Sequence, residues 1–303
     1  MLLGALLAPP LFWILRGLEP WALANGLMKW DPRESNVLIN GPLGFITTEF
    51  QKCFVRAVPL AALLLAIPAA RQLGIRNRRE LGLHEDPAGG AHLLRGFLTT
   101  AVLGTILATT YVLTNIRVLL DPTPWLQVPL TVFGAAITAA VEQFLFQGVI
   151  FGFLRKIARP AVALAWTAVI FAGAHFFKPE ANPPIAHVTW LSGFQLLPTL
   201  FHDATQPNAL LGVFLPLLAL GWLTGFPRLR TDALWLSIGL HAGALFLARS
   251  LSAVTQPGQS LAPWAGPGLL QGAAALAMLL AALLFIRLRL DHEELLPNRR
   301  PSD

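Results

Sequence analysis

Long apolar runs separated by short polar segments dominate the chain. Eight runs have the length of a membrane-spanning helix, about 17–25 residues or more. They cover residues 2–18, 54–72, 96–116, 126–153, 161–177, 208–226, 232–250 and 266–286. The runs are continuous and rich in Leu and Ala, whereas the strands of a membrane barrel would alternate apolar and polar residues. The pattern therefore predicts an all-α, polytopic membrane bundle of about eight transmembrane helices.

Composition supports this class and charge suggests its orientation. The chain has 303 residues, of which 55% are hydrophobic and 13% charged, with a mean hydropathy of +0.60. Basic residues cluster at Arg71, Arg76, Arg78 and Arg79, at Arg155, Lys156 and Arg159, at Arg228 and Arg230, and at Arg287, Arg289, Arg299 and Arg300. These clusters fall in alternate loops and the C-terminal tail, which the positive-inside rule assigns to the cytoplasm. We therefore predict an integral membrane protein with both termini cytoplasmic.

The remaining composition excludes some partners. The net charge of +6 and the pI near 10.4 come from the ends of the spans, so topology explains them better than nucleic-acid binding does. Cys53 is the only cysteine, which rules out an intramolecular disulfide.

The apolar N-terminus has no basic region before it, so it is interpreted as a retained first span and not as a signal peptide. The lipid bilayer is the first predicted partner.

The chain has no internal repeat and is interpreted as one domain with three parts. Residues 1–90 hold flanking spans and a basic cytoplasmic loop, residues 91–250 form the core, and residues 251–303 hold the last span and the tail. The extramembrane stretch from Lys178 to Pro207 is longer than a connector needs to be. Its Trp, Phe and Leu content predicts a loop packed on the membrane or re-entering it, with His187, His202 and Asp203 at its surface.

Three ionisable residues, Glu142, His175 and His241, lie within apolar spans of the core. Such groups are costly in hydrocarbon, so they usually face the protein interior and have a function there. A carboxylate and two imidazoles are groups that activate water. At a rise of about 1.5 Å per residue, all three lie roughly 15–21 Å from the cytoplasmic band. We expect them to meet at one level, in a cavity that opens toward the outer face.

Small residues near this trio favour close helix packing. Gly239 and Gly243 bracket His241, and Gly148 and Gly152 follow Glu142 at the same four-residue spacing. Small residues at this spacing let membrane helices approach one another closely. They therefore support the expected convergence.

The segments around the trio resemble one family of membrane proteases. The run from Glu142 to Gly148, EQFLFQG, resembles the EExxxR motif of the CPBP family (CAAX protease and bacteriocin-processing, also called Abi). Phe171 to His175, FAGAH, is similar to its FxxxH motif, and the stretch leading to His241 is similar to the one before its HxxxN motif. The resemblance covers residues 90–250, with each motif in a separate span.

The resemblance implies an eight-helix fold and hydrolysis of peptide bonds in the membrane. Glu142 would be the base that activates water, His175 would assist it, and His241 would bind water or stabilise the oxyanion. Phe171 would support the site as part of the FxxxH motif. The implied partner is a peptide or protein substrate in or near the membrane, and the implied location is a bacterial-type plasma membrane.

The chain departs from the family pattern at three positions. Gln143 replaces the second Glu and Gln147 replaces the Arg, so an amide pair on one helix face is expected where the family has an ion pair. Leu245 replaces the Asn four residues after His241, and losing one oxyanion donor costs about a hundredfold or more in rate. Ser237, one turn before His241, could supply a hydroxyl, although Ser in a helix more often bonds its own backbone.

Two hypotheses follow, with a third behind them. The first is an intramembrane endopeptidase that uses glutamate-activated water. The second is an impaired relative, a pseudoprotease that acts as a binding, immunity or scaffold protein. A proton-coupled transporter would also use a buried relay, but the repeated halves typical of that class are missing.

The motifs of other intramembrane protease classes are missing, which leaves the class that uses Glu and His. The sequence has no HExxH, no pair of membrane aspartates and, around Ser192, no rhomboid-type glycine pattern. Glu142, His175 and His241 could also hold one zinc ion with an open position. In that case Glu142 would be a ligand and the base would be missing, so we favour the form without a cofactor.

Overall fold

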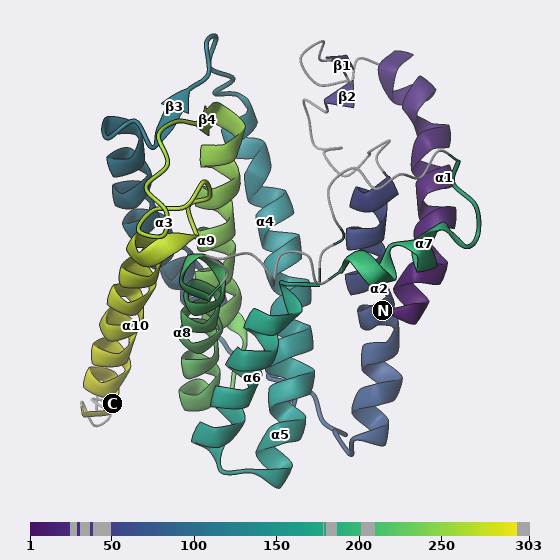
Figure 1. The fold of residues 1–303 in the computed structure, drawn as a ribbon. Helices are drawn as coiled ribbons and strands as arrows, with labels where there is room; N and C mark the ends of the chain where they lie inside the picture. The colour runs from purple at the N-terminus through teal and green to yellow at the C-terminus, as the bar shows by residue number, and fades with distance from the viewer. Residues whose placement is uncertain are drawn as a thin grey trace.

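Helices form almost all of the described structure (Figure 1). The computed structural model describes residues 1–24, 29–30, 37–38, 50–177, 179, 187–200 and 210–295. The helices are α1 (Leu2–Ala24), α2 (Phe50–Gln72), α3 (Gly89–Leu113), α4 (Gln127–Gln143), the π-helix η1 (Phe144–Ile150), α5 (Phe151–Ile157), α6 (Pro160–Ala174), α7 (Ser192–Gln195), the 3-10 helix η2 (Leu197–Thr199), the π-helix η4 (Leu210–Phe214), α8 (Leu215–Thr231), α9 (Trp235–Val254) and α10 (Gly272–Leu295). The predicted all-α membrane bundle is confirmed.

Within the described residues, strands form two short antiparallel pairs outside the apolar helices. In the first, β1 (Lys29–Trp30) pairs with β2 (Val37–Leu38). In the second, β3 (Arg117–Leu119) pairs with β4 (Thr255–Pro257), with Val118 opposite Gln256. The second pair joins the chain after α3 to the chain after α9, so it ties together the ends of two neighbouring helices.

Six helical segments of the described chain are long and apolar enough to cross a membrane. They are Phe50–Gln72, Gly89–Leu113, Gln127–Ile157, Leu210–Thr231, Trp235–Val254 and Gly272–His292. The other two predicted spans are also helical, but their apolar stretches Leu2–Leu18 and Pro160–Ala174 are shorter. Each of the eight predicted runs therefore contains a helix, and six of these helices meet the length of a span.

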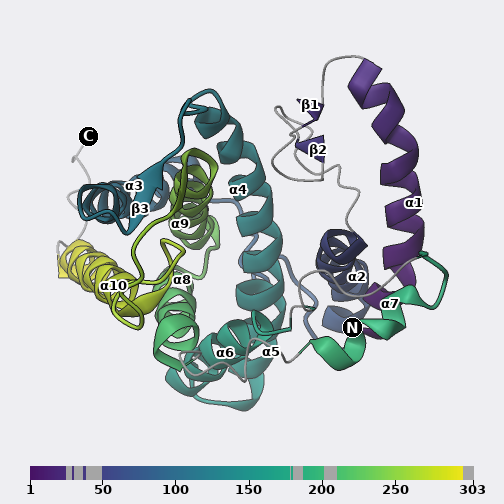
Figure 2. The ribbon, with the colours of Figure 1, turned by 45° about the horizontal axis from the view of Figure 1, so that its top comes forward.

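The helices form two groups, as Figures 1 and 2 show from two directions. The larger group packs α3, α4 and α8 around α9, whose residues are the most buried of the six long segments, and α10 packs on α8 and α3. The smaller group pairs α1 with α2, and α7 packs on α1. The two groups meet mainly where the lower part of α2 contacts η1, through Ala66, Ala70 and Val149. The predicted trio belongs to the larger group.

Glycines allow a close contact between α3 and α9. A Cβ atom on Gly239 would lie 2.0 Å from the backbone oxygen of Leu93, and one on Gly243 would lie 2.3 Å from that of Phe97. Gly96 of α3 faces α9 in the same way. The expected close packing around His241 is therefore confirmed, because any larger residue would push α3 away.

The glycines after Glu142 have a different neighbour from the expected helix. A Cβ atom on Gly148 would lie 3.1 Å from the backbone oxygen of Leu81, and one on Gly152 would lie 3.0 Å from that of Glu80. These two oxygens belong to the loop between α2 and α3. This loop, and not another helix, uses the space that the small residues leave.

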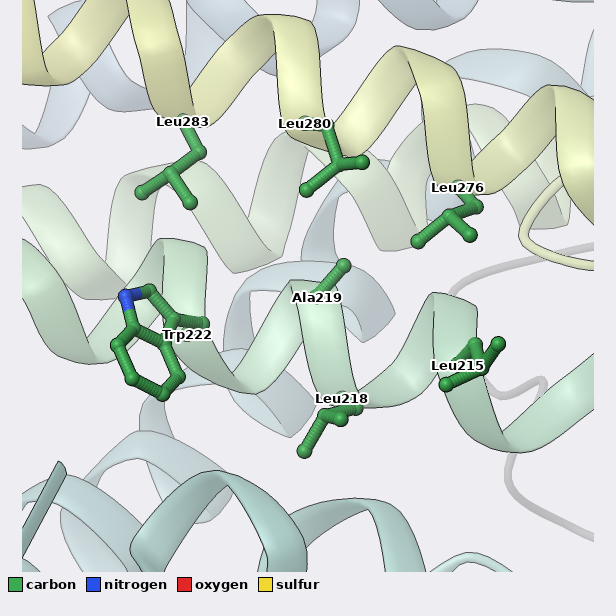
Figure 3. Close-up of a pocket in the computed structure, with 7 residues that line it drawn as sticks. All are labelled: Leu215, Leu218, Ala219, Trp222, Leu276, Leu280 and Leu283. Atoms are coloured by element: carbon green, nitrogen blue, oxygen red, sulfur yellow. The ribbon is translucent and has the colours of Figure 1, made fainter. Parts of the chain in front are cut away.

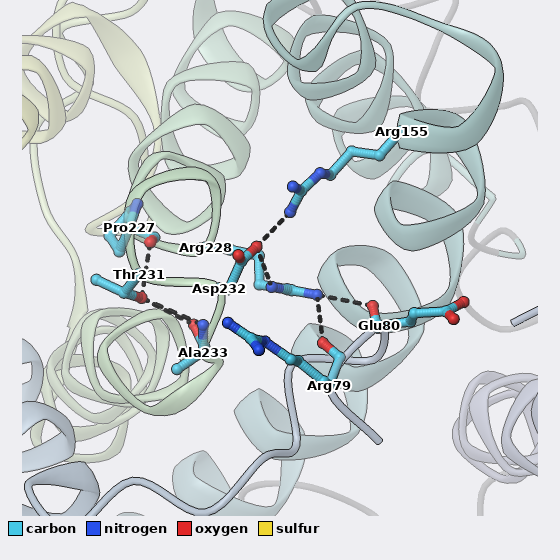
Figure 4. A network of polar contacts seen from close by, with 8 residues as sticks. All are labelled: Arg79, Glu80, Arg155, Pro227, Arg228, Thr231, Asp232 and Ala233. Carbon is cyan, nitrogen blue, oxygen red and sulfur yellow. Dashed lines mark hydrogen bonds and ion pairs between the residues drawn. The ribbon is translucent and has the colours of Figure 1, made fainter. Parts of the chain in front are cut away.

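Basic residues from the loop between α2 and α3, the end of α5 and the end of α8 meet at one end of the bundle, shown in part in Figure 4. Arg228, buried near the end of α8, donates to the backbone oxygen of Glu80 at 2.7 Å and pairs with Asp232. Arg155 also pairs with Asp232, and Lys156 pairs with Glu80 at 2.7 Å. The predicted basic bands thus share one end. That this end is cytoplasmic, with both termini on that side, stays a prediction.

The long loop is described only in part. Residues 180–186 and 201–209, which include His202 and Asp203, lie outside the described residues. Of the described part, His187 is exposed, whereas Leu196 and Leu200 are buried against α1 and α2. The Arg299–Arg300 tail also lies outside the described residues. The visible loop therefore packs on the smaller helix group.

Acidic pH should weaken the ion pairs at this basic end of the bundle, because it protonates Asp232. Burial alone would raise the pKa of Asp232, but the hydrogen bond from Arg155 and the charges of Arg155 and Arg228 hold it below its ordinary value. A carboxylate with a lowered pKa stabilises the fold above its ordinary pKa and loses that contribution as the pH falls through the lowered value. Asp232→Asn should therefore lower the unfolding temperature at pH 7 and reduce its fall between pH 5 and 3.

Thermal unfolding in detergent at several pH values checks this. The effect should correspond to less than about 1 kcal/mol, because Asp232 is partly exposed and such ion pairs are weak. Asp121→Asn changes an exposed aspartate in the loop before α4 and serves as the control. Equal pH dependence of the wild type and Asp232→Asn would show that this ion pair does not stabilise the fold.

Candidate active site

The three predicted residues come together from three helices. Oε2 of Glu142 lies 3.8 Å from Nε2 of His175 and 3.6 Å from Nε2 of His241. Both distances are longer than a direct hydrogen bond. The expected convergence of Glu142, His175 and His241 is confirmed.

Each of the three residues is placed by a different local structure. Glu142 is the last but one residue of α4, directly before the π-helix η1. His241 lies near the middle of α9 and is fully buried. His175 is not inside a span as expected, because α6 ends at Ala174 and His175 is its C-cap. The site therefore lies where α6 stops inside the bundle.

Hydrogen bonds define which nitrogen of each histidine faces Glu142. Nδ1 of His175 donates to the backbone oxygen of Phe171 at 2.8 Å, because a carbonyl can only accept. Its Nε2 therefore presents a lone pair to the carboxylate when the ring is neutral. Nδ1 of His241 accepts from Nε2 of Gln143 at 2.9 Å, so its Nε2 carries the proton. The two rings thus offer Glu142 one acceptor and one donor.

Phe171 holds both rings in place. Its ring centroid lies 4.6 Å from that of His175 and 5.6 Å from that of His241. Phe146 of η1 packs edge-on against Phe171 at 5.1 Å. Phe171 thus supports the site with its ring and its backbone oxygen, since it is fully buried between the two histidines. That these contacts serve catalysis stays a prediction.

The expected Gln143–Gln147 amide pair does not form in the described structure. Gln143 turns to His241, and Nε2 of Gln147 donates to the backbone oxygen of Gly221 at 3.4 Å. The reason is the π-helix that begins at Phe144. A π-helix closes its turns with i→i+5 hydrogen bonds, so the side-chain spacing of an α-helix does not apply between Gln143 and Gln147. The prediction of an amide pair was wrong because it assumed an unbroken α-helix.

Among the described residues, the buried polar atoms without a hydrogen-bond partner include three on α4, η1 and α9 beside the trio. They are Oε1 of Gln143, Oε1 of Gln147 and Oγ of Ser237, all on fully buried residues. Ser237 therefore does not bond its own backbone, as serine in a helix commonly does. Buried polar groups need partners, and ordered water commonly supplies them. A polar interior thus continues from His241 toward the basic end of the bundle.

The site is open on one side. The side chains of Glu142 and His175 are 23% and 22% exposed, whereas that of His241 is 1% exposed. Glu142 and His175 are therefore accessible from this side, while His241 lies at the buried end of the site with Nε2 facing Glu142. Whether this opening faces the outer side of the membrane stays a prediction.

Metal ligation was the alternative use of the same residues. Within the described residues, no group of three or more His, Cys, Asp or Glu has the arrangement of a metal site. A zinc site requires ligands at about 2.0–2.2 Å from the ion. The chelation experiment described below distinguishes a metal-free site from a zinc site.

One charged residue near the site was missed. Arg249 of α9 donates from Nη2 to Oγ1 of Thr138 at 2.9 Å. It lies at the end of a predicted span, where basic residues usually mark the membrane surface. The sequence spacing could have shown that Arg249 lies on the side of the site. His241, Leu245 and Arg249 follow one another at four-residue intervals along one side of the helix.

A separate hollow lies between α8 and α10 (Figure 3). It has a volume of about 310 Å³ and is lined by Leu215, Leu218, Ala219, Trp222, Leu276, Leu280 and Leu283. Its lining includes no residue of the trio. The hollow is therefore an apolar space between two helices and not part of the candidate active site.

The chain was compared with known proteins. The family model described as type II CAAX prenyl endopeptidase Rce1-like matches residues 123–247. No curated protein and no solved structure matches the chain. The matched region lies inside the predicted core and contains Glu142, His175 and His241. Residues 123–247 are therefore similar to the type II CAAX prenyl endopeptidase Rce1-like family, in agreement with the CAAX protease family that the motifs resemble.

Proposed function

We propose that this protein hydrolyses peptide bonds of a membrane-associated peptide or protein with water activated by Glu142. One observation carries the proposal: Glu142, His175 and His241 meet at 3.6–3.8 Å from three helices of the region that matches the Rce1-like family model. The family is one of proteases, which makes an endopeptidase the expected activity. The family description also suggests a prenylated C-terminal CAAX segment as the first substrate to test.

In the proposed reaction, Glu142 takes a proton from a bound water molecule. The resulting hydroxide attacks the carbonyl carbon of the peptide bond, and the carbonyl oxygen becomes an oxyanion. Glu142 then passes the proton to the leaving amine as the C–N bond breaks, which leaves a carboxylic acid and an amine and restores the Glu142 carboxylate. General acid–base catalysis by a positioned carboxylate contributes about 10²–10⁴-fold.

The two histidines have different tasks in this reaction. His241 presents Nε2–H toward the site and can stabilise the oxyanion as a hydrogen-bond donor. His175 presents Nε2 as an acceptor, so it can hold the second hydrogen of the water molecule while Glu142 takes the first. Gln143 and Phe171 support these tasks because their hydrogen bonds set which nitrogen of each ring carries the proton.

A second candidate function is binding without catalysis, as an immunity, assembly or scaffold protein. Leu245 favours it, because this residue cannot donate a hydrogen bond where the family motif has Asn. The absence of the Glu–Arg pair at Gln143 and Gln147 points the same way. Such a pseudoprotease would bind peptides at this site and release them unchanged.

The test is cleavage in proteoliposomes. Purified protein is incubated with quenched fluorescent peptides, including prenylated CAAX peptides, in water enriched in ¹⁸O. Peptide hydrolysis should place one ¹⁸O atom in each new carboxylate, as measured by mass spectrometry. A folded protein that binds these peptides and cleaves none of them would support the pseudoprotease instead.

Chelation should leave this activity unchanged. If Glu142 acts as the base with no metal, incubation with a strong zinc chelator, followed by its removal, should change kcat/KM by less than about twofold. Metal analysis of the same sample by mass spectrometry serves as the control. Loss of activity on chelation and its return on adding zinc would assign Glu142 and the histidines as ligands.

A further inference from the structure

Arg249 is a charged residue of a membrane-spanning helix that the proposed reaction does not use. Arginine is costly inside a bilayer, so it usually faces the protein interior or a functional site. Near the end of a span, an arginine can also extend its charge to the membrane surface. The direction of the Arg249 side chain decides between these two cases.

The hydrogen bonds between α4 and α9 show that direction. Ser250 and Thr131 approach within 2.9 Å through their hydroxyl groups, which fixes the level of the two helices. Arg249, next to Ser250, reaches Thr138, seven residues further along α4. At about 1.5 Å per residue, this is roughly 10 Å deeper into the bundle. The side chain therefore points away from the nearer helix end and toward Glu142.

The packing makes room for the guanidinium at this depth. A Cβ atom on Gly134 would lie 2.9 Å from Nη1 of Arg249, so a side chain there would displace it. Thr138 is one helical turn from Glu142, about 6 Å along the axis. At that position the charge of Arg249 interacts with the carboxylate of Glu142 and the ring of His241.

The surroundings of Arg249 are also accessible. Arg249, Thr138 and Leu245 are each only partly buried, as is Glu142 itself. These residues line neighbouring turns of α4 and α9, beside the open side of the trio. A molecule that reaches Glu142 can therefore also reach the guanidinium, whose hydrogen bond to Thr138 uses one of its five N–H groups.

We propose that Arg249 binds a carboxylate of the peptide substrate and so fixes where the peptide is cut. The inference rests on the proposed hydrolysis and names a specificity residue for it. A guanidinium binds a carboxylate with two parallel hydrogen bonds, which gives both affinity and orientation. An extended peptide rises about 3.3 Å per residue, so the carboxylate lies about two or three residues from the bond that reacts.

The carboxylate can come from the C-terminus of the peptide or from an Asp or Glu side chain. Both sources present the same group to Arg249. Arg249 lies just beyond the matched family region, which ends at residue 247. The substrate preference of this protein would then depend on a residue outside the family match.

The experiment measures binding and cleavage of matched peptides. A fluorescent prenylated peptide ending in Cys-Ala-Ala-Leu is made as the free acid and as the C-terminal amide. A third peptide is an amide with Asp two residues after Cys, and a fourth has Asn there. Binding is measured with Glu142→Gln protein, which should not cleave, and kcat and KM are measured with Glu142 intact.

We expect the acid to bind at least about tenfold more tightly than the amide. Arg249→Leu should abolish this preference, and Arg249→Lys should keep part of it. Gly134→Ala should weaken the preference without removing a charge, and alanine favours a helix, so this variant should fold. A preference for Asp over Asn in the amide pair would identify a side-chain carboxylate, and a preference for the free acid alone would identify the C-terminus.

Other results would overturn the inference. If Arg249→Leu lowers kcat equally for acid and amide while their affinities stay the same, Arg249 only influences Glu142. Equal binding of all four peptides by protein that keeps Arg249 would exclude the subsite. The proposed hydrolysis fails separately: an acid preference that depends on Arg249, without cleavage of any peptide, leaves a binding protein with this subsite.

Discussion

Glu142→Gln is expected to lower kcat/KM by about a thousandfold or more. The substitution keeps the size of the side chain and removes the group that accepts a proton from water. Base catalysis by a positioned residue contributes about 10²–10⁴-fold, and the amide cannot return a proton to the leaving amine. Initial cleavage rates of wild type and Glu142→Gln in the same proteoliposomes measure the effect.

A matched control separates this effect from a general change in charge. Glu85 lies exposed in the loop before α3, so Glu85→Gln should cleave at the wild-type rate. Both variants should unfold at temperatures close to the wild type, because neither changes the volume of a packed residue. If Glu142→Gln keeps more than a tenth of the activity, Glu142 is not the base and the proposed mechanism is wrong.

Much of the fold follows from the apolar pattern alone. The eight predicted runs each contain a helix because an apolar segment in a bilayer must satisfy its backbone hydrogen bonds internally. The ends were harder to place. The run at residues 161–177 was expected to continue past His175, yet α6 ends at Ala174, because apolarity alone does not show where a helix stops inside a bundle.

The trio could also be predicted, because ionisable residues in apolar spans are costly and usually have a function. Glu142, His175 and His241 stand out in the sequence for this reason, and the structure brings them together. Contacts beyond the trio depend on backbone geometry that the pattern does not reveal. The π-helix at Phe144 separated Gln143 from Gln147 and left Gln143 free to turn toward His241.

Arg249 shows a second limit. From the sequence, it resembles the basic residues that mark the ends of spans, and its charge could reach the membrane surface. Only the hydrogen bond to Thr138, together with the level set by Ser250 and Thr131, shows that it points inward. Helical side chains lean toward the N-terminus of their own helix, and in α9 that direction leads to His241.

Leu245→Asn is expected to raise kcat by about a hundredfold. Leu245 stands one turn after His241 on the same side of α9, where the family motif has Asn. Removing one oxyanion donor from other enzymes costs about 10²–10³-fold. Supplying the missing donor should return a gain of similar size, because Leu245 is only partly buried and Asn can reach the open side of the site.

The expected gain requires the amide donor of Asn at position 245 and an intact base at Glu142. Leu245→Asp has nearly the same shape as Asn but adds a negative charge and no amide donor, so it should not raise kcat. The double variant Leu245→Asn with Glu142→Gln should be as inactive as Glu142→Gln alone, since a donor cannot replace the base. A gain that survives loss of Glu142 would mean that the amide acts on binding. No gain in a folded Leu245→Asn protein would mean that His241 already stabilises the oxyanion sufficiently, and that the Asn of the family motif is dispensable in this chain.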